Sequence, residues 1–126
     1  MNVAFDFGIT NTDVVVDYNS KKKFFTFPSQ KINSSFIEEV LESINIQHNE
    51  IKNIAVTGGK SSDLNDTYKN IKITKVNEVD AMGFGAIEIY NLKNKSFVVV
   101  SCGTGTACVY HSSCLLYTSP SPRDRG

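Results

Sequence analysis

The chain has 126 residues, which is long enough for one domain and too short for a large multidomain enzyme. Its 13 basic side chains balance 13 acidic ones, which argues against a general binder of nucleic acids or anionic membranes. Its apolar stretches are far shorter than the ~20 residues that span a bilayer, and its N-terminus lacks the basic segment of a signal peptide. We therefore expect a cytoplasmic protein without nucleic-acid or membrane partners.

The composition changes near the C-terminus. Residues 1–113 contain eleven Lys and no Arg, whereas the last thirteen residues hold both Arg and two of the three Pro. Read back into DNA, Cys114 to Asp124 matches in frame the adapter used in transposase-based sequencing libraries. The alternative is a natural disordered tail rich in Ser and Pro. We expect residues 114–126 to be a translated adapter, and the native protein to continue beyond Ser113.

Residues 1–113 have the pattern of one α/β unit. Three apolar runs separated by turn residues predict a strand meander at Val3–Phe7, Val14–Val16 and Phe24–Phe27. Ser35 to Glu38 has the spacing of a helix capping box, and apolar residues then recur at helical intervals as far as Ile44. This pattern predicts an amphipathic helix that packs one face on a sheet.

The second half of this region continues the alternation of strands and helices. Apolar runs predict four further strands, at Ile54–Val56, Ile71–Thr74, Phe97–Val100 and Ala107–Tyr110. A helix is expected from Asn77 to Tyr90, and a short helical segment between the first two of these strands. The order βββαβ(α)βαββ predicts an α/β fold in which helices flank a mixed β-sheet.

Two turns rich in Gly and Thr carry the expected chemistry. The first comprises Gly8, Ile9, Thr10, Asn11 and Thr12, and the second comprises Gly103, Thr104, Gly105 and Thr106. Glycine lets backbone N–H groups approach an anion and threonine adds hydroxyl donors, so both turns are predicted to hold nucleotide phosphates. Asp6, at the end of the strand before the first turn, is suited to hold a hydrated Mg²⁺. Either turn alone also fits an ordinary hairpin, and neither is a Walker A loop or a Rossmann fingerprint.

Four segments together resemble a known family. The segment from Asp6 to Thr10 resembles the first phosphate motif of the actin, hexokinase and Hsp70-like ATPase superfamily, and Gly103 to Thr106 resembles its second. Between them, Thr57-Gly58-Gly59 and Glu78-Val79-Asp80-Ala81 look like segments of type II pantothenate kinases, in the same order. The resemblance covers residues 1–110.

This resemblance implies a truncated N-terminal domain of the ribonuclease H-like, or actin-like ATPase, fold. It further implies ATP-dependent phosphorylation of pantothenate, the first step towards coenzyme A, with ATP and Mg²⁺ as cofactors. We expect the intact protein to be a homodimer, and the fragment itself to be inactive.

The resemblance also implies roles for individual residues. Asp6 would organise Mg²⁺, and Glu78 would be the general base. ATP phosphates would be held by Gly8, Thr10, Asn11, Thr12, Gly103, Thr104, Gly105 and Thr106, and the substrate cleft would be lined by Thr57, Gly58 and Gly59. Glu78 also stands where a helix dipole favours an acid. Asp80 would either help to orient the substrate or cap the same helix, and we interpret it as a cap.

One departure from the family keeps other functions open. The family's first turn commonly ends in Lys, where this chain has Asp13, so either another Lys serves or Asp13 points away on its strand. One alternative is another enzyme of the superfamily, either an N-acetylhexosamine kinase or a hydantoinase-like ATP-dependent hydrolase, although the Glu-Val-Asp-Ala segment speaks against the hydrolase. A second alternative is a nucleotide-binding module without catalysis.

Overall fold

A computed structural model describes residues 1–91, 93–102, 106–112 and 115–119. These residues belong to two compact units, unit 1 from Met1 to Val76 and unit 2 from Asn77 to Gly126. The sequence pattern predicts one α/β unit over residues 1–113, and the boundary between the two units falls inside that range. None of the helices in the described ranges is long and apolar enough to cross a membrane.

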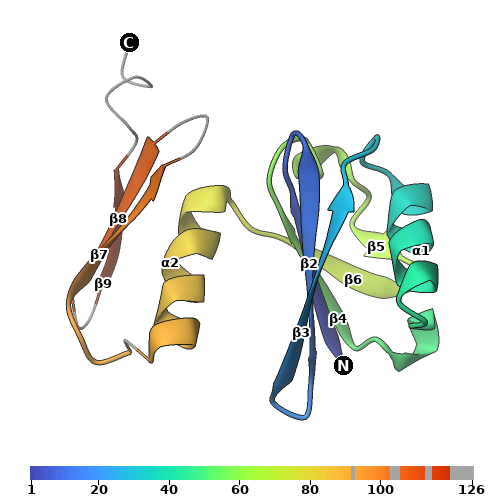
Figure 1. Ribbon diagram of the computed structural model, residues 1–126, viewed down its shortest axis with the longest axis horizontal. Coiled ribbons are helices and arrows are strands. Elements are labelled where there is room, and N and C mark those ends of the chain that lie inside the picture. Colours follow the sequence, from blue (N-terminus) through green and yellow to red (C-terminus); the bar gives the residue numbers. More distant parts are fainter. Residues whose placement is uncertain (92, 103–105, 113–114, 120–126) are drawn as a thin grey trace. The chain divides into compact units, whose positions relative to one another are not determined.

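Unit 1 is built on a six-stranded mixed sheet (Figure 1). Its strands are β1 (Asn2–Phe7), β2 (Asn11–Tyr18), β3 (Lys21–Pro28), β4 (Asn53–Thr57), β5 (Thr67–Tyr68) and β6 (Ile71–Lys75), in the spatial order β3-β2-β1-β4-β6-β5. β1 pairs antiparallel with β2 and parallel with β4, and β4 pairs parallel with β6. The mixed sheet predicted from the sequence is therefore confirmed.

Helix α1 (Ser34–Ser43) covers one face of this sheet. Its N-cap is Asn33, whose side chain accepts a hydrogen bond from the backbone N–H of Phe36 at 3.0 Å. The capping box that the sequence suggests at Ser35 is therefore wrong, because the extended backbone of Asn33 already places a side-chain acceptor at the helix start. The predicted amphipathic helix itself is confirmed, since its buried face is formed by Phe36, Ile37, Val40 and Leu41.

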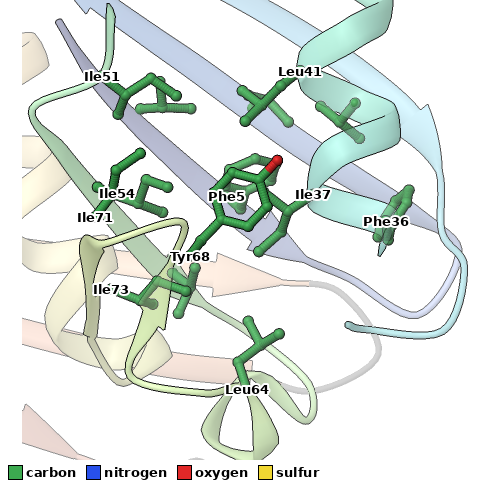
Figure 2. Close-up of a cluster of buried hydrophobic side chains, with 14 of the residues drawn as sticks. Phe5, Phe36, Ile37, Leu41, Ile51, Ile54, Leu64, Tyr68, Ile71 and Ile73 are labelled. Carbon is green, nitrogen blue, oxygen red and sulfur yellow. The ribbon is translucent and has the colours of Figure 1, made fainter. Parts of the chain in front are cut away.

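The core lies between α1 and the sheet (Figure 2). Along β1, residues alternate between buried apolar side chains and exposed or partly exposed ones, as expected for a strand with one covered face. The rings of Phe5 and Phe7 stack with their centroids 5.5 Å apart. The ring of Phe7 also packs against that of Phe36 in α1, with their centroids 6.1 Å apart. Further buried members of this cluster are Val3, Val14, Val16, Ile54, Val56, Ile71 and Ile73.

Two-residue turns set the register of both antiparallel hairpins at the edges of the sheet. Asn19 and Ser20 join β2 to β3 with φ of 51° and 64°, and Lys69 and Asn70 join β5 to β6 with φ of 45° and 69°. Positive φ at both positions is the type I′ geometry, whose twist matches that of the flanking strands. The segment between β4 and β6 contains the 3₁₀ helix η2 (Ser61–Asp63) and β5 rather than the suggested α-helical segment, and a second 3₁₀ helix, η1 (His48–Glu50), precedes β4.

Unit 2 combines helix α2 (Glu78–Tyr90) with a three-stranded antiparallel meander. The strands are β7 (Phe97–Cys102), β8 (Thr106–Ser112) and β9 (Leu115–Ser119), in the order β7-β8-β9. The helix and the first two strands were expected from the sequence, whereas β9 lies in the segment that we interpret as a translated adapter. β8 is the central strand, paired with β7 and with β9, and the Leu-Leu-Tyr-Thr run of β9 has the composition of a β-strand.

Candidate functional site

The candidate site of unit 1 lies at the carboxyl ends of parallel strands. β1 and β4 run parallel with Asp6 level with Thr57, so the chain leaves both strands at the same edge of the sheet. The turn beginning at Gly8 follows β1, and Gly58 and Gly59 follow β4. In open α/β sheets this edge is where ligands bind.

The first predicted phosphate turn is held closed by its own backbone. The N–H of Gly8 donates to the carbonyl oxygens of Asp6 at 3.1 Å and of Asn11 at 3.0 Å. A Cβ on Gly8 would lie 2.5 Å from the Asn11 oxygen, so only glycine fits this position. The next residue, Ile9, projects outward with 87% of its surface exposed. Residues 8–11 are all exposed, so the turn is open to solvent at the sheet edge.

Ser29, immediately after β3, braces this turn from the side. The Ser29 hydroxyl donates to the carbonyl of Gly8 at 2.7 Å. The same Oγ lies 3.0 Å from Oγ1 of Thr12, which is fully buried. The backbone N–H of Ser29 donates to the carbonyl of Thr10 at 2.9 Å. Sequence reasoning missed Ser29, because no motif marks it and only the pairing of β2 with β3 brings it to the turn.

The Thr-Gly-Gly segment packs directly against the end of β1. Gly58 has φ of +88°, and a Cβ there would lie 2.5 Å from the Phe7 carbonyl oxygen and 2.8 Å from Asp6 Oδ1. Gly59 has φ of +37°, and its Cβ would lie 3.1 Å from the same carbonyl oxygen. The predicted substrate segment and the predicted metal ligand are thus neighbours, although they are distant in sequence.

Asp6, Asp13 and Thr57 share the sheet face opposite to the core. Asp6 stands level with Asp13 on β2 and with Thr57 on β4. Thr26 of β3 donates its hydroxyl to Asp13 Oδ1 at 2.8 Å, which gives this carboxylate a polar partner.

Thr57, at the end of β4, carries a side-chain hydroxyl that lacks a polar partner within the part of the chain described above. Its Oγ1 is buried and has no hydrogen-bond partner among the residues that the structure describes. A buried hydroxyl without a partner costs about 1–3 kcal/mol, which a bound group or water would recover. The donor set, one exposed carboxylate beside a hydroxyl and a glycine turn, fits a hydrated Mg²⁺ with phosphate oxygens, because Mg²⁺ takes one or two carboxylates and keeps several waters.

The remaining predicted residues belong to unit 2. Glu78 is the exposed first residue of α2. Asp80 accepts a hydrogen bond from Asn77 Nδ2 at 2.8 Å, and its backbone N–H donates to Asn77 Oδ1 at 2.8 Å. The N-cap of α2 is therefore Asn77, and our interpretation of Asp80 as the cap is wrong, because Asp80 lies inside the first turn, where its carboxylate accepts from the capping side chain. Gly103, Thr104 and Gly105 lie outside the described residues, and Thr106 begins β8.

Comparison with known proteins identifies the fold. No protein-family model and no curated protein matches the sequence. Among solved structures, the activator of 2-hydroxyisocaproyl-CoA dehydratase from Clostridium difficile, with bound ADPNP, matches with a TM-score of 0.66 and 14% identity over 94% of this chain and 45% of that one.

Two further solved structures match similarly. A candidate 2-dehydro-3-deoxygalactonokinase from Sinorhizobium meliloti gives a TM-score of 0.67 and 11% identity over 94% of this chain and 53% of that one. A candidate N-acetylglucosamine kinase from Porphyromonas gingivalis gives a TM-score of 0.62 and 17% identity over 97% of this chain and 48% of that one. The chain spans about half the length of these structures. The likeness confirms the predicted actin-like ATPase fold.

Proposed function

We propose that the intact protein binds Mg²⁺·ATP and transfers a phosphoryl group to the hydroxyl of a small molecule. The observation that carries this proposal is the contact between Gly58 and the end of β1, where the absence of a side chain leaves room for the Asp6 carboxylate beside an exposed glycine turn. Phosphoryl transfer asks a protein mainly for such positioning and for neutralisation of charge.

In this proposal each residue of the unit 1 site has a simple task. Because the Gly8 N–H is engaged within the turn, the N–H groups of the residues after it would meet phosphate oxygens, and Asp6 would hold the waters of a hydrated Mg²⁺. The bound ion supplies positive charge that offsets charge on the phosphates. Thr57 Oγ1 gains the polar partner that it lacks among the described residues. The resemblance assigns phosphate contacts to the second turn, and the role of general base to Glu78.

Solved structures of this fold support a nucleotide-dependent reaction. The Clostridium difficile activator was solved with bound ADPNP, an ATP analogue, and the two other matches carry kinase names. We carry nucleotide use over to this chain as part of the proposal.

For the acceptor, we propose pantothenate. The support is the order of the four sequence segments from Asp6 to Thr106, which resembles that of type II pantothenate kinases. An N-acetylhexosamine is the second candidate, favoured by the match to the candidate N-acetylglucosamine kinase. Both acceptors present a hydroxyl to the same phosphoryl donor, so one assay distinguishes them.

The test is ADP release by the full-length protein, with pantothenate, N-acetylglucosamine or no acceptor. Pantothenate-dependent release would support the proposal, and release only with the sugar would replace the acceptor. Binding of ATP without turnover by any acceptor would support a non-catalytic module. Absence of ATP binding would overturn the function altogether.

A matched pair of variants ties any activity to the site. Asp6→Asn removes the proposed metal-organising charge, so it should raise the Mg²⁺ concentration needed for activity, with partial rescue at high Mg²⁺. Asp17→Asn is the control, because Asp17 is also an acid on this sheet but pairs with Lys22 at 3.8 Å near the opposite end of β2. Equal effects of the two changes would exclude a specific role for Asp6.

A further inference from the structure

Unit 1 has a hollow of about 450 Å³ at the end of the sheet opposite to the glycine turn. It is lined by residues of β2, of β3 and of the chain that follows α1, together with Met1 before β1. Its apolar wall includes Val16, Phe25, Ile44 and Ile46. This size and lining are those of a small-molecule pocket, which typically measures about 300–1,000 Å³ and is mostly apolar.

The hollow exists because α1 is shorter than the hairpin beside it. The helix ends at Ser43, and Asn45 turns the chain away with φ of +59°. Beyond that point the core-facing side of β3 continues with Lys21 and Lys23 instead of apolar residues. The sheet face that α1 covers elsewhere is therefore open here.

The charged lining of the hollow is predominantly positive. Lys21 and Lys23 both line it, and neither makes an ion pair with a residue in the described part of the chain. Lys22 lies between them on the other face of β3 and pairs with Asp17. Glu50 is the one acid among the lining residues, and its Oε1 already accepts the backbone N–H of Gln47 at 3.2 Å.

We propose that this hollow binds a small amphipathic carboxylate, such as a medium-chain fatty acid. Its alkyl chain packs on the apolar wall formed by Val16, Phe25, Ile44 and Ile46, and its carboxylate meets the ammonium groups of Lys21 and Lys23. The two lysines supply charge complementarity, and the apolar wall supplies most of the binding free energy. This site is separate from the proposed nucleotide site and does not depend on it.

Protection of the sheet edge is the competing explanation for the two lysines. β3 is an edge strand, and inward-facing lysines on such strands discourage pairing with other chains. That role accounts for the charges but not for the open apolar hollow beside them. The two explanations differ in one respect that can be measured, namely carboxylate binding.

The test is a titration of the 126-residue chain with sodium octanoate, followed by amide chemical shifts in NMR spectra. We expect saturable shifts confined to residues around the hollow, among them Val16 and Ile46. The double change Lys21→Gln and Lys23→Gln should weaken octanoate binding about fivefold, because each exposed ion pair contributes up to ~1 kcal/mol. Lys22→Gln is the control and should leave octanoate affinity unchanged.

Octanol separates the contribution of the carboxylate from that of the alkyl chain. We expect octanol to bind more weakly than octanoate and to be insensitive to the two lysine changes. Equal binding of octanol and octanoate would overturn the proposal, as would an octanoate affinity that the double change leaves unaltered. Absence of saturable shifts would also overturn it and leave edge protection as the role of the lysines.

Discussion

Gly58 lies against Asp6 so closely that a Cβ on the glycine would stand 2.8 Å from the aspartate Oδ1. The same Cβ would stand 2.5 Å from the carbonyl oxygen of Phe7, which is fixed in the β1 backbone. A side chain at position 58 is therefore excluded by the backbone of a neighbouring strand as well as by the glycine's own φ of +88°. This contact joins the segment after β4 to the carboxylate at the end of β1.

Gly58→Ala should destabilise unit 1 by about 2–4 kcal/mol. Roughly 1–3 kcal/mol arises from overpacking against β1 and the remainder from the left-handed backbone. Urea unfolding, with hydrogen exchange of the β1 amides as the local readout, measures the change. Gly85→Ala is the control, because nothing lies within 4 Å of a Cβ there and alanine favours the α2 helix by up to about 1 kcal/mol. A Gly58→Ala protein as stable as wild type would contradict the contact.

Ser29→Ala should cost about 1–3 kcal/mol of stability. The change removes the donor to the Gly8 carbonyl and leaves the buried Thr12 hydroxyl without its Ser29 partner. The measurement is the free energy of unfolding in urea. Ser43→Ala is the matched control. Ser43 is exposed and its hydroxyl donates to the Val40 carbonyl one helical turn back, so the change should alter the free energy of unfolding by no more than ~0.5 kcal/mol. Equal effects of the two changes would show that Ser29 does not brace the turn.

The stability of unit 1 should fall at alkaline pH through Tyr68. Burial raises the pKa of its hydroxyl above the ordinary value of 10.0, so the unfolded chain loses this proton before the folded chain does. The stabilisation is therefore fully present below pH 10 and is lost as pH rises through the folded-state pKa. Unfolding free energies from about pH 8 to 11 should fall less steeply for Tyr68→Phe than for wild type.

Lys69, the neighbour of Tyr68 in sequence, also contributes to the pH dependence of stability in the alkaline range. A hydrogen bond to Glu38, at 3.0 Å, raises the pKa of the Lys69 ammonium, so its contribution is also lost only at alkaline pH. Tyr68→Phe leaves this ion pair in place, so part of the alkaline loss should remain. Identical pH profiles for the variant and wild type would exclude Tyr68 as a contributor.

Glu78→Gln tests the proposed general base in the full-length protein. If Glu78 accepts the proton of the acceptor hydroxyl, kcat should fall about 10²- to 10⁴-fold while ATP binding is retained. Extra Mg²⁺ should not restore activity, in contrast to Asp6→Asn. Asp80→Ala is the control, since the Asp80 carboxylate accepts from the side chain of the N-cap Asn77, and its loss should cost about 0.5–1 kcal/mol of stability with kcat within a few-fold. Near-normal turnover by Glu78→Gln would remove it from the mechanism.

The sequence by itself determined the elements whose signals are local. Alternation of apolar and polar residues in β1 and helical spacing in α1 each report one covered face, because side-chain direction repeats every two residues in a strand and every 3.6 in a helix. The glycine turn after Asp6 was visible for the same reason, since the need for a residue without a side chain acts at a single position. These signals also sufficed to predict the mixed sheet, whereas the actin-like ATPase fold was implied by the resemblance of four segments to a known family.

Only the tertiary structure decided which distant residues meet. Ser29 reaches the Gly8 carbonyl across 21 positions, and Gly58 meets Asp6 through the parallel register of β1 and β4. No local pattern records such contacts, because they depend on strand pairing and on where each strand ends. The hollow beside Lys21 and Lys23 has the same origin: it follows from the length of α1 relative to the β2–β3 hairpin, a relation between two elements that neither segment carries in its own sequence.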